Sequence, residues 1–155
     1  MTDIRHAEVP RDLNDVRTLF RAYAESLNFN CCFEGFEEEV AALPGEYKPP
    51  AGRLLLAWRG SEVVGCVALR PLDGPACEMK RLYVRPQARG EHLGRRLAER
   101  ACEEARMAGY SRICLDTLPE TMAAAVNLYT AMGFRPVEPY LKNPVPGAIF
   151  LALDL

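Results

Sequence analysis

The sequence lacks several features that would each assign it to a particular class of protein. No apolar run approaches the length of a membrane-spanning helix, and the first residues lack the basic-then-apolar layout of a signal peptide. The formal net charge is only -2, so no basic excess favours a nucleic acid or an anionic membrane as a partner. We therefore expect a globular protein that binds neither nucleic acid nor membranes.

Cysteine occurs six times, but never with the spacing of a metal site. There is no Cys-x-x-Cys; Cys31 and Cys32 are adjacent, and four others lie inside apolar runs: Cys66, Cys77, Cys102 and Cys114. Cysteines placed in this way are typical of reduced packing residues. The pattern predicts a cytoplasmic protein that holds no metal.

The chain of 155 residues has no internal repeat, linker or low-complexity tract, which predicts a single domain over residues 1–155. Apolar periodicity and turn signals predict strands at 4–7, 53–58, 62–70, 77–84, 111–117, 134–140 and 147–155. They predict helices at 10–27, 33–43, 93–108 and 120–132. The order is β-α-α-β-β-β-α-β-α-β-β, with hairpins in the middle and a strand-helix-strand crossover after them. This order predicts an α/β (α+β) protein with a mixed sheet and helices on its faces.

The stretch "EMKRLYVRPQARGEHLG", residues 78–94, gathers positive charge and glycine where a strand meets a helix. The first turn of a helix has N–H groups without partners and carries the positive end of the helix dipole. Glycines let a ligand reach those N–H groups, so the stretch suits a phosphate or pyrophosphate. A surface loop with solvated arginines is the alternative, because neither G-x-G-x-x-G nor G-x-x-x-x-G-K-[ST] is present.

Three motifs, taken in their order along the chain, resemble the GNAT family of acyl-CoA-dependent N-acyltransferases. They are the strand "EMKRLYV", the turn "RPQARGEHLGRRL" and the helix end "NLYTAMGF". The resemblance covers residues 53–136 well. The family's pyrophosphate loop reads Arg/Gln-x-x-Gly-x-Gly/Ala; Arg89 and Gly94 match its ends, and His92 replaces its inner glycine. The resemblance implies the GNAT fold with acetyl-CoA as co-substrate.

The resemblance also implies which residues bind acetyl-CoA. The strand backbone at Leu82, Tyr83 and Val84 would run beside the pantetheine arm, like one more strand on a splayed sheet edge. Backbone N–H groups of the loop would hold the pyrophosphate, over Arg89, Gly90, Glu91, His92, Leu93, Gly94 and Arg95. The 3′-phosphate would meet one of three arginines that are otherwise solvated: Arg85, Arg95 or Arg96.

Tyr129 is the candidate proton donor. It matches the tyrosine with which the family protonates the departing thiolate, and a phenol of pKa ~10 is a plausible acid for a thiol of pKa ~8.5. The alternative is a helix tyrosine that packs between Ala125 and Gly133. The family's usual asparagine seven residues before this tyrosine is absent, and Met122 stands in its place.

Glu78 is the candidate general base, because it matches a strand position where the family often keeps one. In the alternative, a water chain is the base. Glu78 is then an exposed strand carboxylate that pairs with Lys80 or Arg81. Strict alternation along the strand would place residues of mixed polarity on one face: Glu78, Lys80, Leu82 and Val84. A β-bulge in this strand would resolve the mixture.

These motifs predict an N-acetyltransferase that moves an acetyl group from acetyl-CoA to a primary amine by direct attack in a ternary complex. In this fold the loops at 28–36 and 139–147 border the acceptor site, and Tyr140, Lys142 and Asn143 offer polar contacts there. Three glutamates would attract a cationic amine, unless they form only a solvated acidic face: Glu34, Glu37 and Glu46.

We expect the acceptor to be a small, amino-acid-like molecule. A protein N-terminus or lysine is an alternative acceptor. A non-catalytic acyl-CoA-binding module and a phosphate-binding domain unrelated to acyl transfer are alternative functions. The sequence is compatible with a monomer or a homodimer.

Overall fold

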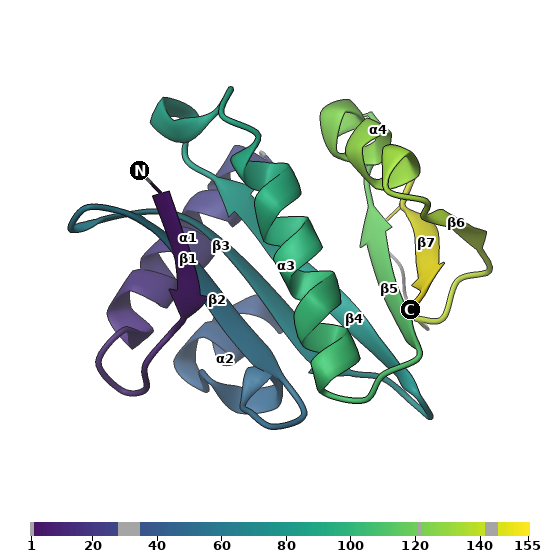
Figure 1. Cartoon of the computed structure of the whole chain (residues 1–155), viewed down its shortest axis with the longest axis horizontal. Helices are drawn as coiled ribbons and strands as arrows, with labels where there is room; N and C mark the ends of the chain where they lie inside the picture. The colour runs from purple at the N-terminus through teal and green to yellow at the C-terminus, as the bar shows by residue number, and fades with distance from the viewer. Residues whose placement is uncertain (1, 28–34, 121, 142–145) are drawn as a thin grey trace.

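A seven-stranded mixed sheet forms the centre of the protein (Figure 1). The computed structural model describes residues 2–27, 35–120, 122–141 and 146–155. The strands are β1 (Thr2–His6), β2 (Arg53–Arg59), β3 (Glu62–Pro71), β4 (Ala76–Val84), β5 (Arg112–Thr117), β6 (Arg135–Val137) and β7 (Ile149–Asp154). Their order across the sheet is β1-β2-β3-β4-β5-β7-β6, and only β4 and β5 pair in parallel.

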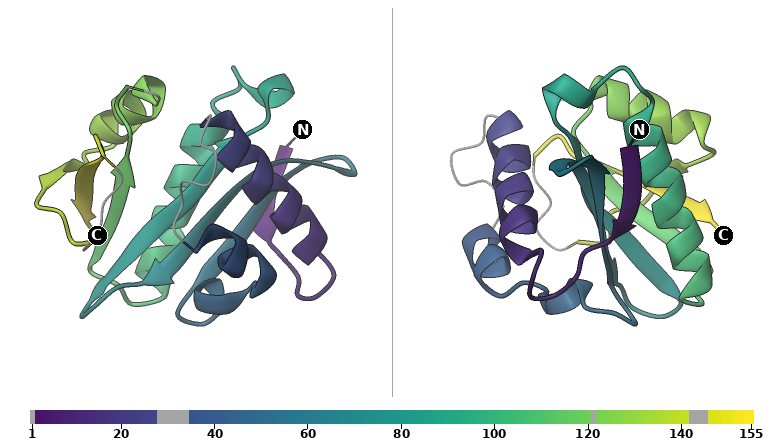
Figure 2. Two further views of the ribbon diagram at one scale, coloured as in Figure 1. Left: turned by 180° about the vertical axis from the view of Figure 1, so that it is seen from behind. Right: turned by 60° about the vertical axis from the view of Figure 1, so that its left-hand side comes forward.

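Four α-helices cover the two faces of this sheet. They are α1 (Leu13–Ser26), α2 (Phe36–Ala41), α3 (Leu93–Met107) and α4 (Ala123–Ala131), and two 3₁₀ turns add η1 (Gly45–Tyr47) and η2 (Pro86–Ala88). Helices α1 and α2 lie on one face and α3 and α4 on the other (Figure 2). The predicted order of strands and helices and the α/β fold are therefore confirmed.

Some predicted boundaries were wrong. Strand β6 covers only 135–137 instead of 134–140, because Pro139, just beyond its end, lacks the N–H that a sheet ladder requires. Helix α1 begins at Leu13 instead of Pro10, because the preceding residues close a turn in which the Asp12 N–H donates to the Glu8 carbonyl at 2.7 Å.

Two hydrophobic cores lie on the two sides of the sheet. On one side α3 buries the apolar residues that recur every fourth position, as the sequence predicted: Leu93, Leu97, Ala101 and Ala105. On the other side α1 buries Leu13, Val16, Leu19 and Phe20 against β2 and β3. Four cysteines are buried and free, as expected for reduced packing residues: Cys66, Cys77, Cys102 and Cys114.

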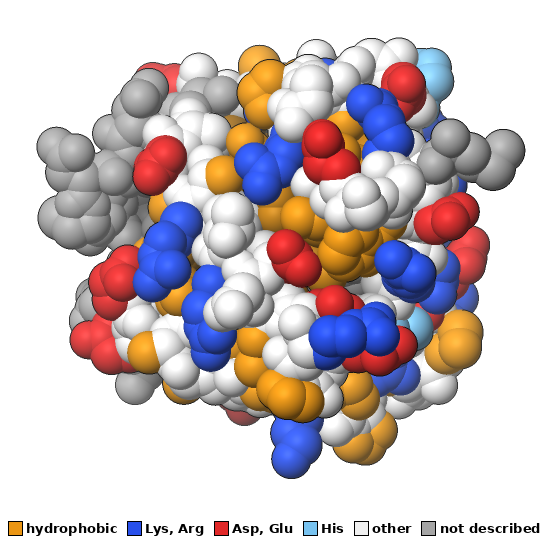
Figure 3. Space-filling view, turned by 90° about the vertical axis from the view of Figure 1, so that its left-hand side faces the viewer, with side chains coloured by type: hydrophobic (Ala, Val, Ile, Leu, Met, Phe, Trp, Pro, Cys, Tyr) orange, Lys and Arg blue, Asp and Glu red, His pale blue; other side chains and the backbone are white. Residues whose placement is uncertain are grey.

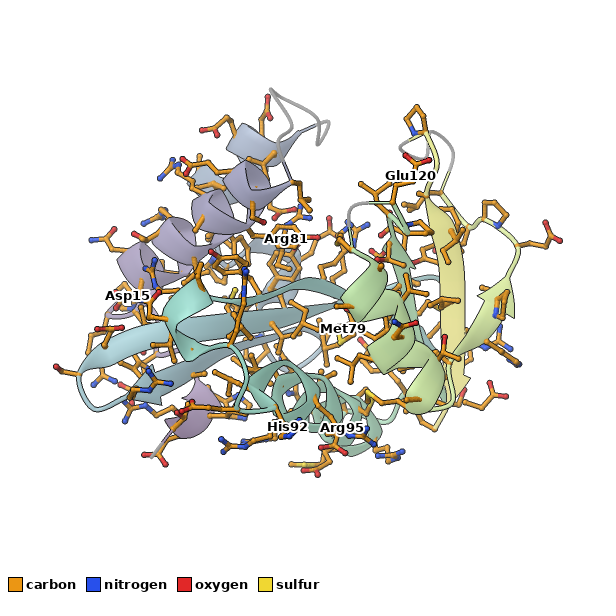
Figure 4. All side chains as sticks on the ribbon, turned by 90° about the horizontal axis from the view of Figure 1, so that it is seen from above. Asp15, Met79, Arg81, His92, Arg95 and Glu120 are labelled. Carbon is orange, nitrogen blue, oxygen red and sulfur yellow. The ribbon has the colours of Figure 1, made fainter. Side chains whose placement is uncertain are left out.

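Strand β4 contains the predicted bulge. Cys66 of β3 lies opposite Tyr83 and Ala68 lies opposite Lys80, so β4 has one residue more than β3 between these pairs. Arg81 lies within the bulge with φ +61. The bulge reverses the alternation, so Met79 and Arg81 lie on opposite faces of β4 (Figure 4). The polar and apolar residues of the strand are thereby separated.

The sheet divides between β4 and β5. These strands pair only from Ala76 with Arg112 to Glu78 with Cys114, and then they diverge (Figure 1). Beyond Glu78, β4 remains paired with β3 alone, and β5 remains paired with β7. The backbone of β4 from residue 79 to 84 therefore has no strand on its β5 side within the described structure.

A buried carboxylate, Glu104 of α3, connects this helix to β1 and β2. It is 1% exposed, and its oxygens lie 3.1 Å from His6 Nε2, 2.9 Å from Arg53 Nε and 3.1 Å from Arg100 Nε. Burial favours a higher pKa of Glu104, but the hydrogen bonds from Arg53 and Arg100 outweigh it, so the pKa is lower than usual. His6 is thus a structural residue in this network.

We expect Glu104→Gln to lower the free energy of unfolding at pH 7 by about 3 kcal/mol, because it leaves two arginines around an uncharged group. Because the pKa of Glu104 is lower in the folded chain than its unfolded value of 4.5, the ionised carboxylate stabilises the fold at any pH above 4.5. This stabilisation is lost as the pH falls through the pKa of the folded chain. Urea denaturation should therefore show a difference that shrinks below pH 4.5. The exposed neighbour supplies the control, since Glu103→Gln should leave stability unchanged. Equal stability of the two variants would contradict a structural role for the network.

The described helices include none that is long and apolar enough to cross a membrane. Figure 3 looks onto the side of the molecule that is on the left in Figure 1, where Lys and Arg side chains are interspersed with Asp and Glu. On this face, neither sign of charge forms a continuous patch.

Candidate active site

The turn between β4 and α3 presents a row of backbone donors. Among the described residues, none accepts a hydrogen bond from the N–H groups of residues 90–95; the first donor of α3 is Arg96, whose N–H reaches the His92 carbonyl at 3.0 Å. Gly94 leaves the space beside this row open, because a Cβ there would meet only Val84 Cγ2, at 3.9 Å. Free N–H groups at a helix start form a site for an anion.

His92 adopts the backbone conformation that a glycine would favour at its place in the loop. Its φ is +57, and Gly90 before it has φ +91. Histidine enters this left-handed region more readily than most side chains, so the loop keeps its course without the inner glycine. The side chain of His92 makes no capping hydrogen bond to the helix. Figure 4 shows His92 and Arg95 together at the beginning of α3.

The arginines of this region differ in where they point. Arg85 and Arg96 donate to carbonyls of β3 and β1, at 3.0 and 2.9 Å. Arg95 is half-exposed and pairs with Glu99 one helical turn away, at 3.4 Å. Of the three arginines predicted for the 3′-phosphate, only Arg95 is thus held by no backbone carbonyl.

Arg89 lies over the end of β4. Its Nε donates to the Val84 carbonyl at 3.0 Å, and its guanidinium lies 5.9 Å from the Tyr83 ring centre. One of the backbone groups predicted to pair with the pantetheine arm therefore already has a donor. Leu82 and Val84 pack toward α3, whereas Tyr83 packs toward α1.

Glu78 lies at the point where β4 and β5 separate, and it is 0% exposed. Its Oε1 accepts a hydrogen bond from Arg70 Nε at 2.7 Å, and its Oε2 accepts one from the Tyr140 hydroxyl at 2.6 Å. Lys80 is further away, with Nζ 4.0 Å from Oε1. The alternative of an exposed carboxylate was therefore wrong, because the Arg70 and Tyr140 side chains supply partners that make burial possible.

Tyr129 of α4 is 6% exposed and packs against Phe134, with ring centres 5.5 Å apart. Burial, together with the negative charges of ionised Tyr23 and Asp116, raises the pKa of Tyr129 above its usual value. The tyrosine therefore keeps its proton at neutral pH. Burial likewise raises the pKa of Tyr23 to about 12, although Arg81 opposes the shift.

Asp116 of β5 connects the groups on the two sides of the split. Its carboxylate lies 3.7 Å from Lys80 Nζ, and Lys80 also approaches Glu78. Burial is the main cause that raises the pKa values of Tyr23, Tyr129 and Tyr140, and the charge of Asp116 adds a smaller increase to each. The charge of one carboxylate therefore acts on three tyrosines from three different parts of the chain.

Arg81 in the bulge is a charged residue that the sequence did not single out for the site. It is buried and makes two hydrogen bonds to Glu39 of α2, at 3.0 and 2.9 Å. Its guanidinium also lies 5.9 Å from the Tyr23 ring and 5.5 Å from the Phe36 ring. This ion pair connects α2 to the strand position where β4 changes face.

The predicted acceptor loops are described only in part. Glu34, Lys142 and Asn143, together with Cys31 and Cys32, lie outside the described residues. Of the remaining acidic candidates, Glu37 lies 3.7 Å from Arg21, and Glu46 lies 3.5 Å from Arg70. Only Glu46 thus belongs to the network around Glu78.

Met122 stands at the N-cap of α4, where the family usually has an asparagine. Its sulfur lies 3.8 Å from the Thr117 hydroxyl, which donates a weak hydrogen bond to it. A thioether accepts but does not donate, so Met122 offers no polar donor to a ligand.

Three features define the scaffold of an acyl-CoA-dependent acyltransferase. They are the divergence of the parallel strands β4 and β5, the row of free N–H groups at the start of α3, and the buried Tyr129. The model of the acetyltransferase (GNAT) family matches residues 14–134. The chain therefore belongs to the GNAT family of acetyltransferases, and the predicted family, fold and enzyme class are confirmed.

Related proteins match two thirds or more of the chain. An N-acetyltransferase of Schizosaccharomyces pombe is 38% identical over 154 residues, which span 98% of this chain and 94% of that protein. The IAA acetyltransferase of Azospirillum brasilense is 42% identical over 110 residues, 68% of this chain and 70% of that protein.

Solved structures share the fold at lower sequence identity. An acetyltransferase from Streptococcus agalactiae superposes with a TM-score of 0.81 at 22% identity, over 99% of this chain and 98% of that one. The yncA protein of Salmonella typhimurium, solved with its cofactor acetyl-CoA, has a TM-score of 0.74 at 20% identity, over 99% and 93% of the two chains.

Proposed function

We propose that this chain transfers an acetyl group from acetyl-CoA to the primary amine of a small, amino-acid-like molecule, by direct attack in a ternary complex. The observation that supports this most is the division of the sheet after Glu78 and Cys114, beside the free N–H groups of residues 90–95. An extended ligand with a phosphate end matches both features. The divided sheet offers an unpaired strand edge to its extended part, and the free N–H groups offer hydrogen-bond donors to its phosphate.

The residues present fit acetyl-CoA. The N–H groups from Gly90 to Arg95 would hold its pyrophosphate, with Gly94 keeping the approach open. The backbone at Leu82 and Tyr83 would run beside its pantetheine arm, while Arg89 closes over Val84. Arg95 is the arginine best placed for the 3′-phosphate, since its partner Glu99 is an exposed residue of its own helix.

Bound acetyl-CoA would supply an activated thioester, and the side chains at the split would move the protons. An ammonium loses one proton to Glu78, which leaves a nucleophilic amine. The nitrogen then bonds to the carbonyl carbon, the carbon–sulfur bond breaks, and Tyr129 gives its proton to the sulfur. The second proton of the nitrogen restores Tyr129. One proton in total remains on Glu78 and later leaves to solvent.

The charges around the split support a small acceptor that carries both an amine and a carboxylate. Carboxylates of Asp116 and Glu46 would attract the ammonium, while Lys80 and Arg70 would attract an acidic group. All four side chains are already paired with one another or with Glu78. A dipolar ligand would therefore replace existing ion pairs without leaving an unbalanced charge.

Calorimetric titration with acetyl-CoA tests the proposal, with adenosine 3′,5′-bisphosphate and ATP as controls. We expect acetyl-CoA to bind more tightly than either control, because only it has the pantetheine arm. Equal binding of ATP would instead indicate a phosphate-binding domain unrelated to acyl transfer. Tight acetyl-CoA binding without turnover would indicate a binding module.

Turnover is then measured as thiol release with a panel of amines. The panel contains putrescine, phenylethylamine, alanine and a peptide with an N-terminal alanine, and IAA is tested beside it, after the name of the Azospirillum relative. We expect alanine, which carries both an amine and a carboxylate, to react faster than the peptide, and the reverse order would favour a protein acceptor.

A further inference from the structure

Glu78 is enclosed so completely that an acceptor amine cannot touch it directly. The side chain is 0% exposed, and each of its oxygens already has a close hydrogen-bond partner. A proton that reaches Glu78 must therefore pass through one of the groups that contact it. Within the described structure, two groups make hydrogen bonds to it, Arg70, from β3, and Tyr140, from the segment between β6 and β7, and Lys80 lies further away, at 4.0 Å.

Only one of the groups around Glu78 can pass a proton on. Arg70 and Lys80 are donors without an acceptor lone pair when charged, and the guanidinium of Arg70 does not lose its proton in water. Burial lowers the pKa of Arg70, but the charge and hydrogen bond of Glu78 together with the charge of Glu46 outweigh burial, so the pKa is raised. A hydroxyl both donates and accepts, so Tyr140 can take one proton while it gives another.

Tyr140 also lies between Glu78 and the surface. Its side chain is partly exposed, and its ring packs edge-on against Phe150 of β7, with ring centres 4.9 Å apart. This packing fixes the ring, while the hydroxyl donates to Glu78 Oε2 at 2.6 Å. The lone pairs of the hydroxyl oxygen accept no hydrogen bond from a described residue.

We propose that Tyr140 is a catalytic residue that relays the proton of the acceptor amine to Glu78. The ammonium transfers a proton to the Tyr140 oxygen as the Tyr140 hydroxyl proton moves to Glu78 Oε2. Tyr140 ends as it began, the amine becomes neutral, and Glu78 becomes protonated. The inference rests on the proposed acetyl transfer and specifies how the amine is activated.

The surroundings keep Tyr140 in the form that a relay needs. Burial and the charge of Glu78 raise the pKa of Tyr140, with smaller contributions from Asp116 and Cys114. The hydroxyl thus stays protonated at neutral and moderately alkaline pH. The other described groups that face Glu78 are cationic, Arg70 and Lys80, and each of them is paired with a further acid, Glu46 on Arg70 and Asp116 on Lys80.

The test compares Tyr140→Phe, Glu78→Gln and the double variant with the unmodified chain. The acceptors are the alkylamine of the panel with the highest turnover and hydroxylamine, which is neutral at pH 7 and needs no base. We expect each single variant to lower kcat/KM for the alkylamine at least ~10-fold at pH 7. The double variant should be no slower than the slower single variant. With hydroxylamine, all four proteins should react at similar rates.

The matched control is Tyr110→Phe, which removes the tyrosine hydroxyl that donates to the Ala51 carbonyl, away from the split. It should retain full activity. Phenylalanine at 140 keeps the ring contact with Phe150, so melting temperature and acetyl-CoA affinity should not change. If Glu78→Gln fails to fold, Tyr140→Phe alone tests the relay, through the ratio of its alkylamine turnover to its hydroxylamine turnover.

Two outcomes would overturn the relay. Unchanged alkylamine turnover in Tyr140→Phe would show that the proton does not need this hydroxyl. An equal loss with hydroxylamine, or losses that multiply in the double variant, would assign Tyr140 to acceptor binding. Either outcome leaves acetyl transfer by the unmodified chain intact, whereas failure of the proposed function would abolish turnover in the unmodified chain itself.

Discussion

Gly94→Glu should weaken acetyl-CoA binding at least ~100-fold, or by about 2.7 kcal/mol, while the protein stays folded. The new carboxylate would stand beside the free N–H groups of residues 90–95 and occupy the position that we assign to the pyrophosphate. It would compete for the same donors and repel the phosphates. Calorimetric titration with acetyl-CoA measures the effect directly.

The fold should tolerate this substitution unusually well. A Cβ at residue 94 would meet only Val84 Cγ2 at 3.9 Å, and the backbone there is not left-handed. Glutamate is a better helix former than glycine and is favourable in the first turn of a helix. Thermal denaturation should therefore show an equal or higher melting temperature.

Gly94→Gln is the matched variant, because it adds similar bulk without the charge. We expect its affinity for acetyl-CoA to lie between those of the unmodified chain and Gly94→Glu. Unchanged affinity in Gly94→Glu would mean that the phosphates bind elsewhere and that Arg89 and Gly94 only shape the loop.

The order of elements could be predicted from local patterns because each element has its own period. The fourfold spacing from Leu93 to Ala105 faces one core, and the alternation along β2 and β3 places residues on both sides of the sheet. The bulge in β4 was predictable too, since its polar and apolar residues do not alternate without one. Proline explains why β6 is shorter than its apolar pattern suggests.

The partner of Glu78 was within reach of sequence reasoning. Arg70 and Glu78 lie on either side of the predicted turn at residues 71–75, and they are opposite each other in the β3–β4 pairing. Pairing the strands about Gly74, one residue beyond the centre of that turn, identifies Arg70 as the cross-strand partner. The hypothesis considered only neighbours along the same strand, Lys80 and Arg81, and so missed it.

Other parts of the site could not be predicted locally. The ion pair between Arg81 and Glu39 joins residues 42 positions apart and depends on where α2 crosses the bulge. Likewise, the pKa of Tyr129 responds to Tyr23 of α1 and Asp116 of β5. Their proximity follows from packing across the sheet, for which no single stretch of sequence carries a pattern.

Tyr129→Phe should lower turnover at least ~10-fold and leave the affinity for acetyl-CoA unchanged. Phenylalanine keeps the packing against Phe134, so only the hydroxyl is lost. That hydroxyl is the proton donor that we assign to the departing sulfur. Steady-state kinetics should show the loss in kcat, with KM for acetyl-CoA unaffected.

The pH dependence separates a proton donor from a packing residue. Burial raises the pKa of Tyr129, so the unmodified chain should keep it protonated, and kcat should not fall on its account until the pH exceeds the usual tyrosine value of 10.0. Tyr129→Phe should lower the whole profile without moving its acidic limb, because that limb reports deprotonation of the acceptor amine. Equal turnover in the two proteins would exclude Tyr129 as the acid and leave water to protonate the thiolate.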